Sequence, residues 1–411
     1  MPATTPGPSS FDGTGTGGQG RLMPATTPGP GSFDGTGTGG QGRLMPATTP
    51  GPSSFDGTGT GGRGRPIPAT TASSGSFDGT GTGVAAGVAE EFQAQRPRLF
   101  GLAYRLLGSA VDAEDTVQDA YLRWQSADQQ AIVAPSAWLT KVVTNLCLNR
   151  LASARAQRER YAGPWLPEPV LTEDGALGPL DDVAQRESVS LALLVLLERL
   201  TPAERGVFVL REAFGYSHGE TAQILELSEA NCRQLQRRAR DRLAQHRGAQ
   251  DRPRFRAERA HWRSLAERFL AAARAGDLRS LERMLAADVT AWTDGGGKVT
   301  AARRPVAGRA QVARYLAGAI GRFGGDARAV FAEVNGAPAI LGVAGGTLVG
   351  VLVLDLSGGE LPAGELPGGE LPGGEITALR AVANPDKLRF AAGQAAPVVT
   401  SEAPARSSLV T

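Results

Sequence analysis

The stretch from Leu200 to Ala244 is LTPAERGVFVLREAFGYSHGETAQILELSEANCRQLQRRARDRLA. Its first residues, Thr201 to Glu204, predict a helix start: Thr is a good N-cap, Pro suits the first turn, and Glu at the third helical position can bond back to the cap. A turn over 215–217 leads into a short helix over 218–225, and a longer helix follows over 229–244. A short helix, a tight turn and a helix with one basic face are typical of a helix-turn-helix.

The helix over 229–244 carries five arginines and an inward apolar stripe of Leu235, Ala239 and Leu243. Side chains near the start of such a helix reach base edges in DNA, and later arginines neutralise phosphates. The alternative is an ordinary amphipathic helix with a solvated arginine face. The candidate DNA-contacting residues are Glu229, Asn231, Arg233, Gln234, Arg237, Arg238 and Arg240.

Residues 89–160 predict a second helical unit. Apolar residues at helical spacing end before Gly108, and we expect Asp112 to be the N-cap of the next helix, with Asp115 three residues on. A third helix is expected after Pro135. The linker over 161–182 contains a Pro-rich segment, and helices are expected again over 183–250.

The unit over 89–160 has an acidic face and a basic face. The acidic face comprises Asp112, Glu114, Asp115, Gln118 and Asp119. The basic face comprises Lys141, Asn145, Asn149, Arg150 and Arg155. One interpretation is two partners, a basic protein surface and DNA. The other is charge that serves helix dipoles and solubility.

Two repeats interrupt the globular sequence. A segment of 22 residues recurs from Met1, Met23 and Met45, and a decayed copy starts at Ile67. Its Gly, Pro, Thr and Ser content cannot bury enough surface to fold, so we expect residues 1–88 to be disordered. They are either a flexible tether or a tandem duplication without a selected role, and the composition favours the duplication. A shorter Gly-Gly-Glu-Leu-Pro repeat over 357–375 is expected to expand a hairpin loop.

After residue 255 the pattern changes to two helices followed by alternating, Gly-punctuated strands, which predicts an α+β domain over 255–391 and a polar tail over 392–411.

Cys147 and Cys232 are the only cysteines, which excludes a disulfide framework and a Cys-rich zinc site. The net charge of +2 excludes a uniformly basic, histone-like protein. No apolar run reaches the roughly 20 residues of a membrane span, and we expect a cytoplasmic protein. We also expect it to need no metal or cofactor.

Longer segments resemble a known family. FGLAYRLLGSAVDAEDTVQDAYLRW at 100–124 with AWLTKVVTNLCLNRL at 137–151 resembles region 2 of the ECF-type (extracytoplasmic function) sigma factors of bacterial RNA polymerase, and 200–243 resembles their region 4. Three further motifs are similar to those of the sigma-J-like group, which carries a fused SnoaL-like domain. They are Trp165-Leu166-Pro167-Glu168-Pro169, Asp294-Gly295-Gly296-Gly297-Lys298 and Asn384-Pro385-Asp386-Lys387-Leu388.

The resemblance implies two all-α domains, sigma region 2 and a region 4 helix-turn-helix, followed by a SnoaL-like (NTF2-like) α+β cone. It implies that the acidic face docks on the clamp coiled coil of the largest subunit of core RNA polymerase. The basic face of region 2 would then open and read the −10 promoter element, and the helix-turn-helix residues would read the −35 element. A loose linker would suit two units that bind separated elements.

The family also implies a regulatory role for the C-terminal domain, in place of a separate anti-sigma protein and without enzymatic activity. Lysine occurs only at Lys141, Lys298 and Lys387, whereas arginine serves elsewhere. We hypothesise that two of these lysines are needed for a buried pair or a tight contact; chance survival is the alternative.

Two other functions remain open on the sequence. The chain could be a helix-turn-helix repressor with a ligand-sensing domain, which would bind promoter DNA without polymerase. The SnoaL-like domain could also be an isomerase or cyclase that uses Asp294, although acid–base residues are sparse in it.

Overall fold

The structure is a computed structural model that describes residues 80–158, 160–173, 175–178, 180, 183–246, 259–323, 327–357 and 375–401. All of them belong to one unit, Ser76–Thr411. Residues 1–79, nearly all of the short repeat and the end of the tail lie outside the described residues, so the predictions made for them stay untested.

Three long helices form the first helical unit: α1 (Thr80–Leu107), α2 (Ala110–Ser126) and α3 (Pro135–Arg158), with a 3-10 turn, η1 (Gln129–Ala131), before α3. The boundary expected at residue 88 is wrong, because α1 begins at Thr80; the sequence after Gly83 leaves the repeat and becomes rich in alanine, which favours helix. Asp112 is not the N-cap of α2. Ser109 is, and its hydroxyl accepts a hydrogen bond from the Asp112 amide at 3.1 Å.

The second helical unit contains α4 (Val183–Val189), α5 (Leu191–Leu197), α6 (Pro202–Phe208), a π-helical turn η2 (Val209–Ala213), α7 (His218–Leu225) and α8 (Glu229–His246). Capping boxes start α6 at Thr201 and α7 at Ser217. Glu226 ends α7 in the left-handed region with φ of 56°, and the Ser228 hydroxyl caps α8. The helix-turn-helix predicted from the sequence is therefore confirmed.

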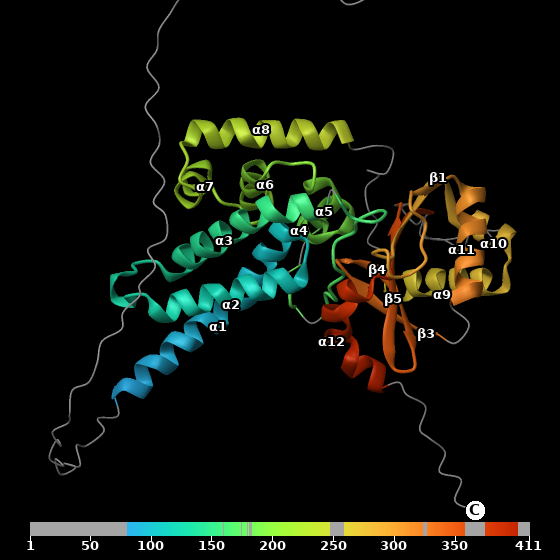
Figure 1. Cartoon of the computed structure of the whole chain (residues 1–411), viewed down its shortest axis with the longest axis horizontal. Helices are drawn as coiled ribbons and strands as arrows, with labels where there is room; N and C mark the ends of the chain where they lie inside the picture. Colours follow the sequence, from blue (N-terminus) through green and yellow to red (C-terminus); the bar gives the residue numbers. More distant parts are fainter. Residues whose placement is uncertain are drawn as a thin grey trace, which may run out of the picture. The chain divides into compact units, whose positions relative to one another are not determined.

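The C-terminal domain is a mixed six-stranded sheet with helices on both faces (Figure 1). Its helices and strands are α9 (Arg259–Ala275), α10 (Leu278–Met284), β1 (Leu285–Asp294), β2 (Val306–Ala307), α11 (Arg309–Phe323), β3 (Arg328–Val334), β4 (Ala337–Ala344), β5 (Thr347–Leu356), β6 (Ile376–Val382) and α12 (Pro385–Ser401).

The strand order is β2-β1-β6-β5-β4-β3, with β1 and β6 parallel and the other pairs antiparallel. One face of the sheet packs on α9, α10 and α11, and the other packs on α12. The predicted α+β domain is confirmed, and its description as an NTF2-like cone stays a prediction. Its expected end at residue 391 is wrong, because α12 continues to Ser401 and buries Ala395 in the core of the domain.

The two helical units share one hydrophobic core. Leu102 and Trp124 of the first unit are buried in the same cluster as Leu194 and Leu210 of the second. Arg98 on α1 also donates a hydrogen bond of 2.6 Å to the hydroxyl of Tyr216, just before α7. The units are therefore packed directly against each other rather than held only by a linker.

The expectation of a loose linker is wrong for its described residues. Leu166, Val170 and Leu171 are buried, and Leu166 and Leu171 belong to the core of the C-terminal sheet face that carries α12. The proline-rich composition of the segment suggested an exposed linker, although the segment also contains these apolar residues. Prolines remove main-chain donors, and two of the donors that remain, the amides of Leu166 and Val170, bond to buried side chains of the C-terminal domain.

Candidate functional site

The recognition surface of the helix-turn-helix lies along α8. Cys232, Ala239 and Leu243 face inward and are buried. All seven predicted DNA-contacting residues of this helix are exposed: Glu229, Asn231, Arg233, Gln234, Arg237, Arg238 and Arg240. This placement gives one polar, largely cationic face that DNA can approach.

Several of these arginines already have acidic partners. Arg233 pairs with Glu229 one turn earlier, and Arg240 lies 2.8 Å from Glu212. Glu212 also accepts a hydrogen bond from the buried Gln236, whose carbonyl oxygen bonds to His218. This connection between α7 and α8 was not predicted, because nothing in the sequence pairs an isolated histidine with a glutamine on the next helix.

The two charged faces of the first helical unit are not separate surfaces. Arg150, predicted on the basic face, lies 2.7 Å from Asp119 and 4.0 Å from Asp115 on the acidic face, and it bonds to the Asp112 carbonyl at 3.2 Å. The antiparallel packing of α2 and α3 brings them together, which helical spacing within either helix could not reveal.

The other predicted residues of these faces have varied surroundings. Lys141 lies 2.9 Å from Glu226, the residue that ends α7. Glu114 pairs with Arg96 at 2.6 Å. Asn149, Asp115 and Gln118 are exposed, Asn145 is half-buried, and the side chain of Arg155 lies outside the described residues.

The three sequence motifs meet at one buried site. Asp294, at the end of β1, is fully buried, and its carboxylate accepts hydrogen bonds from the Leu166 amide at 2.9 Å and from the Lys387 ammonium at 2.7 Å. It also accepts from the Gly296 amide at 3.0 Å and from the Tyr161 hydroxyl. Lys387 donates a further hydrogen bond to the Leu166 carbonyl. One lysine and one aspartate thus bond both main-chain groups of Leu166.

Burial controls the electrostatics of this site. It lowers the pKa of Lys387 from 10.5 to about 8, although the negative charge of Asp294 acts in the opposite direction. The Lys387 ammonium also lies 4.3 Å from the ring centroid of Trp165, and the Arg158 guanidinium lies 4.2 Å from the same centroid. Trp165 therefore contacts a cation from the C-terminal domain and one from α3.

The glycines of the second motif are required by close packing. Gly296 has φ of 60°, and a Cβ there would lie 2.2 Å from the side-chain nitrogen of Asn384. A Cβ on Gly295 would lie 2.3 Å from the Val299 carbonyl oxygen. Asn384 also donates to the Tyr161 hydroxyl at 2.8 Å. The motif is thus a tight turn that faces the third motif and the start of the linker.

Glu168 connects the linker to the first helical unit. Its carboxylate accepts hydrogen bonds from the amides of Ala110 and Val111, at 2.8 and 3.0 Å, and from the Ser109 hydroxyl. Burial raises the pKa of Glu168, and the hydrogen bonds oppose that shift. The flanking Pro167 and Pro169 are buried. The linker motif therefore contacts α2 and the C-terminal domain at once.

Asn335 makes a second connection that the sequence analysis missed. It is fully buried in the turn between β3 and β4, and its side-chain nitrogen donates 2.7 Å hydrogen bonds to the Tyr104 hydroxyl and the Val189 carbonyl. Its side-chain oxygen accepts from the Val170 amide at 3.1 Å. An Asn-Gly pair between two strands is a typical hairpin signal, so its sequence context indicated only a turn.

The acid–base role considered for Asp294 does not suit this geometry, because its carboxylate is occupied by four donors. Over the described ranges, no group of His, Cys, Asp and Glu could hold a metal ion. No helix in the part of the chain that the structure describes is both long and apolar enough to cross a membrane.

Two family models match parts of this chain. The family model of Sigma-70 region 2 matches residues 92–157, and that of Sigma-70, region 4 matches residues 190–243. The ECF RNA polymerase sigma factor SigJ of Mycobacterium tuberculosis (strain H37Rv) is 44% identical over 235 residues, which cover 57% of this chain and 73% of SigJ. The probable ECF RNA polymerase sigma factor SigI of M. tuberculosis (strain CDC 1551) is 33% identical over 281 residues, or 67% of this chain and 90% of SigI.

A solved structure is similar as well. The crystal structure of the M. tuberculosis extracytoplasmic function sigma factor SigJ matches with a TM-score of 0.53 and 34% identity, and the match covers 73% of this chain and 98% of that chain.

Proposed function

Because this chain belongs to the ECF RNA polymerase sigma factors, we propose that its C-terminal domain keeps the two promoter-reading units packed together and so limits initiation. The chain directs RNA polymerase to specific promoters and supports transcription initiation there. Sigma factors are not enzymes, and the fused domain would act by holding the other two units, in place of a separate anti-sigma protein.

The span of a promoter supports this proposal. Elements named −10 and −35 are about 25 base pairs apart, which is roughly 85 Å of duplex at about 3.4 Å per base pair. In the structure, Lys141 of the first unit lies 2.9 Å from Glu226 of the helix-turn-helix, and the two units share a core. The units must separate before both elements can be bound at once.

The observation that carries the proposal is the burial of the linker motif against the C-terminal domain. Asp294 and Lys387 bond both main-chain groups of Leu166, and Asn335 bonds Tyr104, Val170 and Val189. Separation of the two helical units would break the Asn335 hydrogen bond to Tyr104 or the one to Val189, and a buried hydrogen bond contributes about 0.5–1.5 kcal/mol net. The C-terminal domain therefore adds a barrier to opening.

A reversible crosslink tests whether opening is required. Lys141→Cys and Glu226→Cys, joined by a short cleavable bis-maleimide, would hold the units together. Cys147 and Cys232 are buried, so the reagent should reach the introduced thiols first. We expect promoter-dependent transcription with core polymerase to be lost on crosslinking and restored on cleavage. The uncrosslinked double variant controls for the loss of Lys141, and equal activity before and after cleavage would contradict the proposal.

We also propose that α8 reads the −35 element with the seven exposed residues named above. Replacing Arg233 with Ala should relax sequence choice at one position and cost about 1–3 kcal/mol, as for an arginine that contacts a base edge. Replacing the exposed Arg238 should weaken binding evenly and reduce the salt dependence. Arg242 is a poor probe of DNA contact, because it pairs with the buried Glu204. A binding assay over a promoter library at two salt concentrations separates the two effects, and unchanged selectivity in the Arg233 variant would contradict the assignment.

The exposed part of the acidic face is proposed as the core-polymerase contact, and Asn145 and Asn149 as −10 contacts. Leu122, which is 54% exposed on α2, adds an apolar residue to the polymerase-facing helix. Replacing Leu122 with Ser should weaken polymerase binding without changing promoter choice, because exposed apolar residues at interfaces contribute through burial. A polymerase pull-down with the full chain measures this effect.

A further inference from the structure

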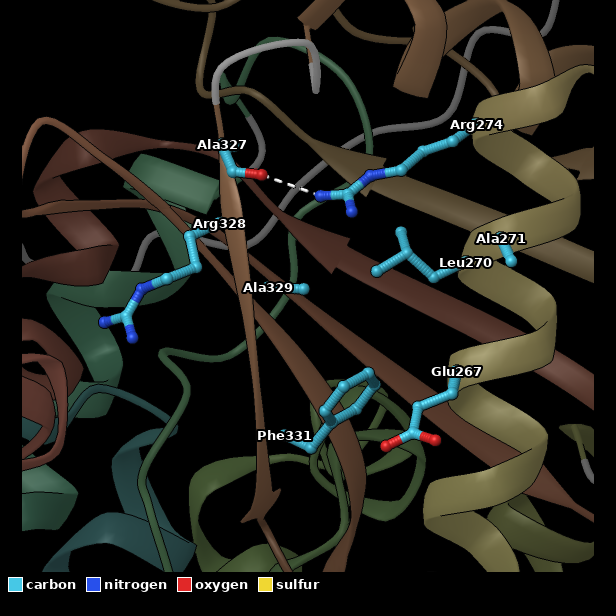
Figure 2. Close-up of a pocket in the computed structure, with 8 residues that line it drawn as sticks. All are labelled: Glu267, Leu270, Ala271, Arg274, Ala327, Arg328, Ala329 and Phe331. Carbon is cyan, nitrogen blue, oxygen red and sulfur yellow. Dashed lines mark hydrogen bonds between the residues drawn. The ribbon is translucent and has the colours of Figure 1, made fainter. Parts of the chain in front are cut away.

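A groove of about 660 Å³ lies between helix α9 and strand β3 of the C-terminal domain (Figure 2). Leu270 and Ala271 line it from α9, and Ala329 and Phe331 line it from β3. Phe331 and Leu270 are half-buried against the core, whereas Ala271 is exposed. The groove has an apolar centre that is open to solvent.

The strand beside the groove has an open edge. β3 is the last strand of the sheet. The amide and carbonyl of Glu333 point away from β4, since they bond to the Glu173 carboxylate at 3.2 Å and to the Thr172 amide at 3.1 Å. Alternate residues of a strand point the same way, so the main-chain groups of Ala329 and Phe331 also face outward. Neither has an outward partner among the residues that the structure describes.

The same edge already accepts an extended segment at its other end. Leu171 of the linker forms an antiparallel bridge with Val334, and the Asn335 amide donates to the Val170 carbonyl at 2.9 Å. The open part of β3 thus continues an edge whose end pairs with extended chain. A groove between an edge strand and a helix is a geometry in which strand addition recognises peptides.

Charges at the two ends of the groove define the partner. Arg274 lies at one end, where it donates a 2.7 Å hydrogen bond to the Ala327 carbonyl, and Glu267 lies beside Phe331 at the other (Figure 2). Arg263, one turn before Glu267 on α9, also lies at this second end, with its guanidinium 5.7 Å from the Phe331 ring centroid. Seven helical residues separate them, or about 10.5 Å along α9. In a strand, side chains at i, i+2 and i+4 face one side and span about 13 Å. An acidic, an apolar and a basic side chain at that spacing complement Arg274, the apolar centre and Glu267.

We propose that the groove between α9 and β3 binds an extended peptide of a partner protein by strand addition to β3, with acidic, apolar and basic side chains alternating into the groove. The main chain of the peptide pairs with Ala329 and Phe331. The surface lies on the sheet face that carries α9, and the linker motif packs on the opposite face. On the β3 edge the linker pairs at Glu333 and Val334, so a partner that pairs at Ala329 and Phe331 need not displace it.

Fluorescence anisotropy of the full chain with a labelled peptide, Ser-Asp-Ser-Val-Thr-Lys-Ser, tests the proposal. We expect saturable binding that is lost when alternate peptide amides are N-methylated, because strand addition needs those donors. Ala329→Pro removes one outward amide of the edge strand and should weaken binding about fivefold. Arg274→Glu should weaken binding of this peptide and favour the charge-reversed peptide with Lys and Asp exchanged.

Arg279→Glu, at an exposed position on the neighbouring helix α10, is the matched control and should leave binding unchanged. The N-methylated peptide tests the main-chain pairing without altering the protein, so the test does not depend on the folding of any variant. Absence of saturation up to about 1 mM would overturn the proposal. Binding that survives both N-methylation and Ala329→Pro would overturn it as well.

Discussion

Two lysine–aspartate pairs join the same two turns of the C-terminal domain, and they differ in their surroundings. Lys387 and Asp294 are separated by 2.7 Å, with side chains 8% and 0% exposed. Lys298 and Asp386 are separated by 2.6 Å, with side chains 54% and 53% exposed. Residues from one pair of sequence motifs thus form a buried pair and a solvated one at nearly equal distance.

The distance between the two charges does not by itself set the energy of an ion pair. When a solvated pair forms, each charge replaces contacts with water by contacts of similar strength with its partner, so the pair contributes about 0–1 kcal/mol. A buried pair has lost its water, so removing one partner leaves an uncompensated charge and costs about 3–5 kcal/mol. The buried pair bonds to the linker, through Tyr161 and Leu166.

The largest expected effect comes from Asp294→Ala. It leaves the Lys387 ammonium buried without its carboxylate, and we expect the free energy of unfolding to fall by about 3–5 kcal/mol. Urea denaturation followed by circular dichroism measures this loss. A loss below about 1 kcal/mol would show that the buried pair behaves like the solvated one and would remove the basis of the comparison.

Lysine-to-arginine exchange at both positions sharpens the comparison. The broader guanidinium of Lys387→Arg must fit between Trp165 and Leu166, and such overpacking costs about 1–3 kcal/mol. Lys298→Arg remains in solvent and should change stability by less than about 0.5 kcal/mol. Equal denaturation midpoints for the two variants would reject the need for a compact ammonium at position 387.

The pH dependence of the buried pair is a smaller effect. Burial lowers the pKa of Lys387 from 10.5 to about 8 in the folded chain, so the unfolded chain binds more protons between those pH values. The contribution of Lys387 to the free energy of unfolding therefore rises with pH across this window, by at most about 1.4 kcal/mol per pH unit. Below about pH 8 the lysine is protonated in both states and this contribution is constant.

Urea denaturation of the natural chain and Lys387→Met from pH 7.5 to 9.5 isolates this group, because other titrating groups cancel in the difference. The stability of the natural chain relative to the variant should increase with pH. A decrease would mean that the folded chain holds this proton more tightly than the unfolded one.

The smallest effect is expected for the solvated pair. Lys298→Ala and Asp386→Ala should each lower the free energy of unfolding far less than Asp294→Ala does, and added salt should reduce even that effect. The measurement is the same urea denaturation at low and high salt. A loss comparable to that of Asp294→Ala would show that exposure does not separate the two pairs.

Much of the local structure could be predicted from the sequence. The start of α6 at Pro202 and the turn between α7 and α8 follow from capping residues and apolar spacing that lie within a few positions of each other. Of the two lysines in the C-terminal motifs, Lys387 forms a buried pair and Lys298 a close but exposed one; the need for lysine at these positions stays a hypothesis. The sequence of the two motifs does not distinguish these lysines. Lys298 follows a run of glycines and Lys387 follows an aspartate, and neither neighbour indicates whether the lysine is buried.

The expectations that failed concern contacts between distant elements. Arg150 joins the acidic face because α2 and α3 pack side by side, and the linker is buried because a sheet more than a hundred residues away covers it. Neither arrangement leaves a periodic signal in the sequence. Pro-rich segments suggest exposed linkers by composition, but the exposure of Leu166 depends on what packs against it.

The helix-turn-helix, most of the helices and the family follow from the sequence alone, because caps, turns and apolar periodicity act between residues close in the chain. The burial of particular charges, the shared core of the two helical units, and the position of the linker motif against Asp294 and Lys387 depend on the folded chain. The physical reason is that the energy of a charge or an apolar side chain depends on the solvent it loses, and that loss depends on distant segments brought together by folding.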